Sequence, residues 1–451
     1  MTSLRQTPAA PDPEDNAGGA SGPQEGVHHS PAYPTDHRNP LTRRIARAGE
    51  SGRNGIDPRH FFPILWRSAS TASCLCNVLW PVVPAALAVR YARSDLHLII
   101  FILNYIAMVP CANTIGFAGQ ELARKLPKVI GVLTETTLGS VVELILFIVL
   151  LTRDQFGVIR SAVLGSILAT LLLCLGLCFF AGGLRREEQE FSETVSEVGS
   201  GLLLTAGLGL FVPSAYSHAV TGTTLLTEEE VIDNILHISR VSSILLIVAY
   251  VIYIWFQTQS HHGIYDALLQ GDEKKDDDRR EEEVKAKLTL TESLLALGVS
   301  MTLVTLVAIS LVEQIDFIVQ ERGITEPFMG LILVPLVEKA AEHLTAIDEA
   351  WDDQMNFALS HVLGATIQTS LLNAPLVVIV GWGLQKGMNL NFELFEIVIL
   401  ILSIVVVGNF LRDQKSNYLE GSLCVIVYMV VAVAAFYFPG TETGSSTVEN
   451  T

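Results

Sequence analysis

Charged residues are scarce in this chain, making up 17% of its 451 residues, whereas 50% are hydrophobic. They are also unevenly placed, since stretches such as 141–151, 244–256 and 397–407 hold at most one charge each. A helix that crosses a bilayer needs about 20 predominantly apolar residues. The lack of charge in these stretches excludes an ordinary soluble globular protein and predicts a membrane protein that spans the bilayer many times.

Other absences narrow the class of function. No basic patch with interleaved aromatic residues is present, so no nucleic-acid partner is expected. The chain also has no nucleotide-binding loop and no catalytic triad, so we expect neither an enzyme nor a bound cofactor. The six cysteines lie in apolar stretches at spacings that match no zinc site, so we interpret them as small buried helix residues, neither disulfide-bonded nor metal-binding. They are Cys74, Cys76, Cys111, Cys174, Cys178 and Cys424.

Polar segments divide the chain into regions. The first 66 residues are rich in proline, glycine, serine and charge, which predicts a disordered tail and no cleavable signal peptide. A second polar insert carries the acidic run 272–283, whose acids alternate with bases and lack EF-hand spacing, so we expect a solvated loop and no calcium sensor. The predicted regions are 1–66 (cytosolic tail), 67–95 (leading transmembrane helix), 96–259 (first five-helix repeat), 260–288 (acidic cytosolic loop), 289–438 (second five-helix repeat) and 439–451 (short C-terminal tail).

Eleven apolar stretches are long enough to be transmembrane helices, so the predicted fold class is an all-α integral membrane protein. With the N-terminus in the cytosol, the loops on that side carry thirteen Lys and Arg residues against seven on the other side. Basic residues accumulate on the cytosolic side of membranes. We therefore expect a cytosolic N-terminus and a C-terminus on the opposite side. The predicted spans are 70–90, 96–119, 128–151, 161–184, 196–219, 239–258, 290–313, 328–349, 356–382, 393–411 and 418–438.

An internal repeat relates the two halves of the chain. Each half has an acid inside an apolar span and, 22 residues later, a glycine that opens the small-residue stretch of the next span. An odd number of crossings separates the acids, so the two five-helix copies run in opposite directions, as in many secondary transporters. Three pairs share a spacing of 199 residues: Glu143 and Glu342, Gly165 and Gly364, and Gly182 and Gly381.

The two repeat-equivalent glutamates are the candidate ion-binding residues. A carboxylate inside a span costs several kcal/mol unless a cation, water or hydrogen bonds compensate it. Hydroxyl and amide side chains nearby suit a hard cation such as calcium. They are Thr136, Thr137, Ser140, Ser166 and Thr170 in the first half and Thr366, Gln368, Thr369 and Asn373 in the second. Loss of the cation would favour proton uptake by the acids, which gives obligate exchange. The alternative is a pair of buried acids that hydroxyl groups or one another satisfy.

The chain resembles the vacuolar calcium/proton exchangers of the calcium/cation antiporter superfamily from about residue 75 to residue 438. The resemblance lies in GSIL, LCLGLCFFAGGLRREEQEF, ISRVSSILLIVAYVIYIWFQTQSH, AAEH, GATIQTSLLNAPLVVIVGW, FELFE and KSNYLEGS. It implies eleven spans, an acidic loop after the sixth, and ion-binding glutamates at Glu143 and Glu342. The second repeat of the family usually carries the motif Gly-Asn-Ala-Ala-Glu-His, whose histidine corresponds to His343. The resemblance also implies that Gln368 helps to line the site.

The repeat motifs depart from this pattern. Gly139-Ser140 and Glu338-Lys339 stand where the family has Gly-Asn. If Lys339 points into the cavity, it competes with the transported cation, and Glu338 and Glu135 restore the charge. Alternatively, Lys339 turns away and pairs with Glu338 or another acid at the helix–helix contact. His343 is predicted either to tune proton binding or to be a polar residue that is hydrogen-bonded between helices.

These observations predict a cation/proton antiporter of a vacuolar or other intracellular membrane, with calcium or another divalent ion as first choice. A monovalent cation/proton antiporter is the alternative because of Lys339. A transport-inactive scaffold or sensor is the alternative from another class, and a passive channel is least favoured. The predicted cation- and proton-binding residues are Glu143, Glu342, Ser140, Gln368, Thr137, His343, Glu338 and Lys339, of which Glu143 and Glu342 would bind the metal ion.

Overall fold

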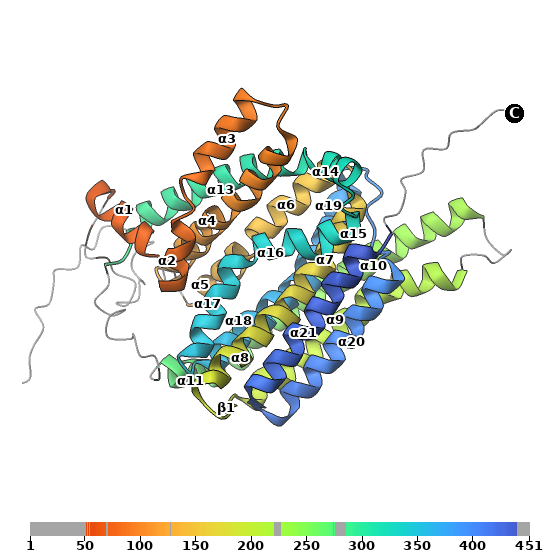
Figure 1. The fold of residues 1–451 in the computed structure, drawn as a ribbon. Helices are drawn as coiled ribbons and strands as arrows, with labels where there is room; N and C mark the ends of the chain where they lie inside the picture. Colours follow the sequence, from red (N-terminus) through yellow and green to blue (C-terminus); the bar gives the residue numbers. More distant parts are fainter. Residues whose placement is uncertain are drawn as a thin grey trace, which may run out of the picture. The chain divides into compact units, whose positions relative to one another are not determined.

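The fold was analysed in a computed structural model, which describes residues 51, 53, 55–68, 71–126, 128–220, 227–273, 275 and 286–439. Most of the described residues are helical, as predicted (Figure 1). The helices up to residue 185 are α1 (Pro58–Arg67), α2 (Thr71–Asn77), α3 (Val82–Ala92), α4 (His97–Ala123), α5 (Lys128–Gly139), α6 (Val141–Thr152), α7 (Phe156–Leu168), the π-helix η2 (Ala169–Cys174) and α8 (Leu175–Arg185).

The middle of the chain continues with longer helices. These are α9 (Glu193–Val220), α10 (Glu228–Trp255), the π-helix η3 (Phe256–Ser260), α11 (His262–Glu273), α13 (Leu290–Val312), α14 (Ile315–Arg322), α15 (Glu326–Phe328), the π-helix η4 (Met329–Leu333), α16 (Val334–Glu338) and α17 (Ala340–Trp351). The last helices are α18 (Met355–Gln368), the π-helix η5 (Thr369–Asn373), α19 (Ala374–Gly383), α20 (Leu394–Phe410), the 3-10 helix η6 (Leu411–Asp413) and α21 (Tyr418–Tyr437).

The part of the chain that the structure describes contains nine helices that are long and apolar enough to cross a membrane. The two remaining predicted spans, 128–151 and 328–349, are each broken near their middle, into α5 and α6 and into α16 and α17. Each half is therefore too short to meet the length of a bilayer-crossing helix. The nine long helices support the predicted fold class, and the count of eleven crossings stays a prediction.

Two predicted boundaries need correction. The tail predicted to be disordered up to residue 66 ends in a helix, α1, whose Asp57 side chain accepts a hydrogen bond from the Arg59 amide as an N-cap. The leading span contains a turn between α2 and α3, and Ser73–Ala92 is nevertheless one of the nine membrane-length helices, as predicted. The acidic loop begins with α11, and Asp272 is buried where a solvated charge run was expected. Apart from Glu273 and Lys275, the remainder of that run lies outside the described residues, as does the 439–451 tail apart from Pro439.

Buried Asp272 illustrates why charge patterns alone misplace single residues. Its carboxylate accepts hydrogen bonds from the backbone and side-chain nitrogens of Asn356, at 2.7 and 3.1 Å, and thereby caps the start of α18. An acid that accepts backbone N–H groups at a helix N-terminus is stabilised there by the helix dipole. The aspartate therefore tethers α11 to α18.

The loops gather at two ends of the described helices. At one end, which we call the ladder end, the segments 185–190, 272–275, 352–353 and 413–416 meet, and strand β1 (Gln189–Glu190) pairs antiparallel with β2 (Lys415–Ser416). At the other end, the Glu313 end, Glu313 binds both Arg90 and Arg153, at 2.9 and 2.7 Å. These are the two groups of loops that the charge analysis assigned to opposite sides of the membrane.

Packing between the halves of the chain forms the core. α4 lies along α13, α8 lies along α21, and α7 packs against η4 (Figure 1). Small side chains allow the last of these contacts, because a Cβ atom at Gly165 would collide with the backbone of Leu331. The core therefore places the broken helix α16–α17 directly against the first half of the chain.

Candidate functional site

The two broken helices break at equivalent positions. Ser140 lies between α5 and α6, and Lys339 lies between α16 and α17, 199 positions later. Their backbones share one conformation, with φ −96° and ψ 3° at Ser140 and φ −96° and ψ −4° at Lys339. This conformation lies in the sparsely populated bridge region, which interrupts a helix without reversing the chain.

The repeat extends beyond the breaks. The turns that follow α6 and α17 each contain an aspartate with positive φ, 59° at Asp154 and 67° at Asp353, again 199 positions apart. Aspartate tolerates this left-handed conformation better than most residues. The next helix in each half contains a π-helical turn, η2 or η5, at the corresponding place. The spacing found in the sequence therefore describes a structural repeat.

Each predicted glutamate lies in the first turn of a half-helix. Glu143 is the third residue of α6, and Glu342 is the third residue of α17. The unpaired N–H groups and the dipole of a helix N-terminus stabilise negative charge there. Breaking the helix at the middle of the span thus makes a buried carboxylate less costly than it would be inside a continuous helix.

Glu143 is 1% exposed and is held by the second half of the chain. The hydroxyl group of Thr369 donates to its two carboxylate oxygens, at 3.0 and 2.9 Å. The side-chain amide of Asn373 donates to Oε2 at 2.8 Å. Both donors lie in η5, so this π-helical turn positions the first glutamate.

Glu342 is held much less firmly. Its side chain is 34% exposed, and its Oε2 atom lies 3.3 Å from Nζ of Lys339. The residue that corresponds to Thr369 in the first half is Thr170, whose hydroxyl donates to the Ser166 carbonyl and lies 3.4 Å from Nε2 of His343. The threonine of η2 thus contacts the histidine that follows the second glutamate, and Glu342 itself stays accessible.

Lys339 lies between the two glutamates. Its ammonium group is 3.1 Å from Oε2 of Glu143 and 3.3 Å from Oε2 of Glu342, and the side chain is 3% exposed. The sequence left open whether this lysine points into the site or turns away to pair with Glu338 or another acid at a helix–helix contact. In the structure its ammonium group lies within salt-bridge distance of both repeat-equivalent acids.

Glu338 lies beside this triad without being part of its salt bridges. It is 3% exposed, and neither of its carboxyl oxygens has a hydrogen-bond partner among the described residues. Glu143, Lys339 and Glu342 are its electrostatic neighbours. Three acids and one lysine therefore share a small volume at the level of the helix breaks. An unpaired buried carboxyl group is costly unless it binds a proton or a cation.

The other predicted residues fall into two sets. The amide of Gln368 donates to the hydroxyl of Ser140 at 2.9 Å, which joins the break in the first half to α18 in the second. His343 is buried, and its Nε2 atom lies 3.4 Å from the hydroxyl oxygen of Thr170. Thr137 is exposed, and its backbone carbonyl accepts a hydrogen bond from Ser140. Ser140 and Gln368 thus belong to the wall of the site, whereas Thr137 contributes its backbone.

Two functional contacts were not in the predicted site. Thr369 and Asn373 stood out in the sequence only as neutral oxygen-bearing residues near the acids, yet both donate to Glu143. The one signal in the sequence is that Thr369 and Thr170 are 199 residues apart, so that a threonine stands at this position in both repeats. Nothing in the sequence indicates a π-helical turn, and that turn is what directs both side chains toward the same carboxylate.

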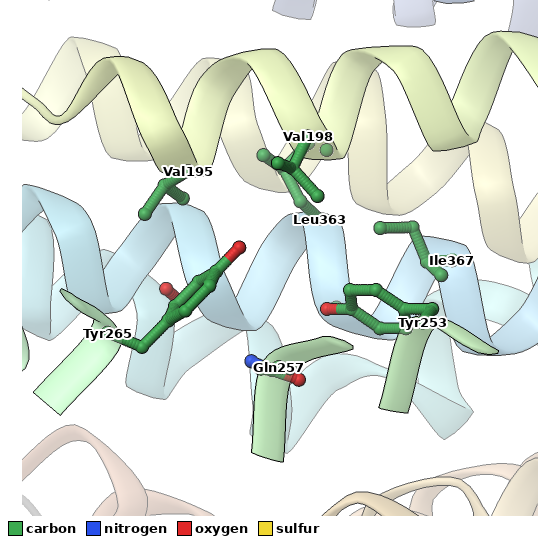
Figure 2. Close-up of a pocket in the computed structure, with 10 residues that line it drawn as sticks. Val195, Val198, Tyr253, Gln257, Tyr265, Leu363 and Ile367 are labelled. Carbon is green, nitrogen blue, oxygen red and sulfur yellow. The ribbon is translucent and has the colours of Figure 1, made fainter. Parts of the chain in front are cut away.

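Close packing differs between the two halves. Gly165 on α7 is covered by the backbone of Leu331, whereas a Cβ atom at its counterpart, Gly364 on α18, would meet no other atom within 4 Å. Gly364 faces a small cavity between α9, α10, α11 and α18 (Figure 2). Tyr265 of α11 lies on one side of this cavity, and Val195 of α9 lies on the other. The cavity is separate from the glutamates of the site, none of which lines it.

The arrangement can bind one positive charge between two acids from opposite halves of the chain. A change in the relative position of α6 and α17 would alter the distance between those acids. The site lies at the junction of two half-helices from opposite repeats, which is where many secondary transporters bind their ions. These are the physical requirements of an ion exchanger.

Comparisons with known proteins agree with this interpretation. The family model for sodium/calcium exchanger protein matches residues 96–259 and 292–437. A vacuolar calcium ion transporter of Schizosaccharomyces pombe is 33% identical over 341 residues, covering 75% of this chain and 79% of that protein. Vacuolar cation/proton exchanger 3 of Oryza sativa subsp. japonica is 33% identical over 362 residues, covering 80% of this chain and 85% of that protein.

Solved structures share the fold. Native YfkE aligns with a TM-score of 0.65 at 25% sequence identity, covering 80% of this chain and 100% of that one. An H+/Ca2+ exchanger, CAX, aligns with a TM-score of 0.55 at 14% identity, covering 82% of this chain and 89% of that one. The second likeness concerns the fold alone.

Proposed function

The chain belongs to the sodium/calcium exchanger protein family, and we propose that it is a secondary antiporter that exchanges a cation for protons across an intracellular membrane. The observation that carries this proposal is the meeting of Glu143 and Glu342 at one ammonium group. Two acids from equivalent positions of two repeats thereby share one cationic position. Secondary transporters bind their ions in such places, at the repeat interface and next to half-helix ends.

The exchange needs few groups. A cation that binds between Glu143 and Glu342 neutralises both carboxylates, and its departure leaves negative charge in a medium of low dielectric, which favours the binding of protons. Thr369 and Asn373 keep Glu143 in place, so Glu342, with its partly exposed side chain, is the acid that changes position. Alternation between the cation-bound and the protonated pair makes the two fluxes obligatorily coupled.

Calcium or another divalent ion is the first choice for the cation. The relatives named above include a calcium ion transporter and a cation/proton exchanger of vacuoles, so we extend calcium transport and a vacuolar location to this chain as proposals. Carboxylate, hydroxyl and amide oxygens around Glu143 and Ser140 are ligands that calcium accepts.

A monovalent cation is the second candidate, because Lys339 occupies the position between the acids. Two like unit charges 4 Å apart repel by about 4 kcal/mol at an effective dielectric of 20. A divalent ion meets twice the repulsion that a monovalent ion meets at the same distance, unless it displaces the lysine. The position of Lys339 therefore favours weak divalent binding or a monovalent substrate.

Uptake by vesicles that contain the purified protein tests the antiport. With an inward-acidic pH gradient, we expect wild-type protein to accumulate calcium or, for the second candidate, sodium or potassium. Glu143→Gln and Glu342→Gln should each abolish uptake, because each removes a charge that binds the cation. Wild-type rates in either variant would contradict the central role of the pair. A wild-type protein that moves none of these cations would favour a transport-inactive scaffold or sensor.

The double variant Glu338→Gly/Lys339→Asn distinguishes the two candidate cations. It restores the Gly-Asn of the related exchangers and removes one acid together with one base, so the net charge of the site is unchanged. We expect it to lower the calcium concentration at half-maximal uptake by roughly tenfold or more, since about 1.4 kcal/mol of repulsion corresponds to that factor. An unchanged calcium concentration would place Lys339 outside the calcium path.

We also propose that the ladder end faces the cytosol. The excess of Lys and Arg lies in its loops, and the N-terminal Arg53 contacts Glu292 next to the acidic insert. Protease sites introduced at the N-terminus and in the acidic loop should be cleaved from the cytosolic side of intact vacuoles, and a C-terminal site should be protected. Cleavage at both termini from one side would contradict an odd number of crossings.

A further inference from the structure

A second buried acid lies away from the glutamate pair. Glu396 is in the first turn of α20 and is 1% exposed. Its Oε1 atom lies 2.5 Å from the hydroxyl oxygen of Ser161 on α7. Its Oε2 atom is buried and has no hydrogen-bond partner in the described part of the chain. The antiport mechanism makes no use of this group.

The charges around Glu396 do not neutralise it directly. Arg160 of α7 and Glu393, just before α20, are its charged electrostatic neighbours. The guanidinium group of Arg160 donates to the side-chain oxygen of Asn389, at 3.2 Å, and is also shared electrostatically with Glu326 of α15. Glu396 therefore has a nearby base, but its only hydrogen bond among the described residues is to a serine.

A carboxyl group with this environment is better suited to a proton than to a metal ion. An ionised carboxylate needs several donors when it is buried, and Glu396 has one. A protonated group needs fewer donors: its Oε1 atom accepts a hydrogen bond from the Ser161 hydroxyl, and its unpartnered Oε2 atom holds the proton. A metal ion would need further oxygen ligands, and no cluster of three metal-binding side chains exists among the described residues.

The place of Glu396 gives the proton a mechanical consequence. The hydrogen bond joins α20 to α7, the helix whose Gly165 packs against the broken helix of the second half. The counterpart of Ser161 in the repeat is Ser360, which lines the cavity beside α11 and has no hydrogen-bond partner for its hydroxyl among the described residues. The Ser161–Glu396 contact is therefore made in one half of the repeat and not in the other.

We propose that Glu396 is a proton-binding site at the Glu313 end, and that its protonated form latches α20 to α7. When the proton leaves for solvent at that end, the O–H bond of Glu396 breaks, and the resulting carboxylate needs several donors. It is drawn toward the guanidinium group of Arg160, and this movement takes it away from the single donor at Ser161. A low pH at the Glu313 end keeps the latch closed, and a higher pH releases it. The assignment of this latch to the exchange cycle rests on the proposed antiport; the binding of the proton does not.

Infrared spectroscopy of the purified full-length protein in lipid nanodiscs tests the proton-binding site. At neutral pH, the wild type should show a carbonyl band from a protonated buried carboxyl group. Glu396→Gln should lower the intensity of this band by the contribution of one carboxyl group, and the matched control Glu393→Gln, at the N-cap of the same helix, should retain the full intensity. A spectrum in which Glu396→Gln leaves the band unchanged would overturn the proposal.

A second variant covers the case in which Glu396→Gln does not fold. Ser161→Ala removes the hydrogen-bond partner and leaves the carboxyl group, so it should shift the frequency of the same band; an unshifted band would contradict the Ser161–Glu396 contact. In the vesicle assay, Glu396→Gln should lose the dependence of uptake on the pH at the Glu313 end. Failure of all uptake by the wild type would refute the antiport, and the infrared result would still decide whether Glu396 binds a proton.

Discussion

The two halves of the molecule have the same backbone plan and opposite degrees of constraint. Glu143 accepts three hydrogen bonds from η5 and is buried, whereas Glu342 is one-third exposed and bonds to Lys339 alone among the described side chains. Gly165 is packed against its neighbour, whereas Gly364 faces a cavity. The two halves thus have the same order of turns and helix breaks, but one glutamate is firmly held and the other is not.

This difference shows how a repeat protein can have two unequal states. If both halves were packed as tightly as α7 against η4, neither acid could move. The observed asymmetry has one tight and one loose contact. If the chain is an antiporter as proposed, exchanging the two contacts would produce the opposite state.

The largest difference in stability between equivalent variants of the two halves is expected at the two glutamates. Glu143→Gln should lower the free energy of unfolding by about 3 kcal/mol, because it leaves the buried Lys339 with one acid instead of two. Glu342→Gln should cost about 1 kcal/mol or less, because that side chain is partly exposed. Thermal denaturation of the two variants in detergent measures the difference. Equal destabilisation would show that the second acid is as firmly held as the first.

The glycines should give the next largest difference. Gly165→Ala is expected to destabilise the protein by about 2 kcal/mol, because the added methyl group meets the Leu331 backbone, which cannot rotate away. Gly364→Ala should be close to neutral, since the methyl group enters open space. The unfolding midpoints of this matched pair provide the measurement. A large destabilisation by Gly364→Ala would contradict the open space beside Gly364 and would mean that another segment packs against α18 there.

A smaller difference is expected at the π-helical turns. Thr369→Ala removes a hydroxyl group that donates to Glu143 and should cost about 1 kcal/mol as well as most of the cation affinity. Thr170→Ala, at the equivalent position, removes a contact with His343 and should leave cation affinity within about twofold of wild type. Thr369→Ser should restore affinity. Uptake measured against cation concentration for the three variants provides the test. An equal loss of affinity in Thr369→Ala and Thr170→Ala would contradict the prediction.

The smallest effects should be found where the halves are alike. Asp154→Gly and Asp353→Gly replace two residues with positive φ by the residue that adopts this conformation most easily, and both lose surface salt bridges. The two changes nearly cancel, so each variant should be within about 0.5 kcal/mol of wild type. Denaturation midpoints that differ between them would extend the asymmetry to the turns.

Much of the fold follows from residues that can be recognised in the sequence. Apolar stretches such as 397–407 predict helices that cross the membrane, because the bilayer admits few other structures. The spacing between Glu143 and Glu342 predicts the repeat, and the structure places both acids at equivalent helix breaks. The breaks themselves were not predicted, since Ser140 and Lys339 are both compatible with a helix interior. Neither was the helix α11, because its composition suggested a solvated loop.

The sequence alone determined that the chain spans a membrane, that its halves repeat, and which two acids are equivalent, because hydrophobicity and spacing are properties of the residues themselves. Only the tertiary structure decided that Lys339 reaches Glu143, that η5 fixes Glu143, and that Ser161 contacts Glu396. Each of these contacts joins residues from opposite halves of the chain. Their geometry depends on how α7, α16 and α20 pack, and packing is a property of the whole fold.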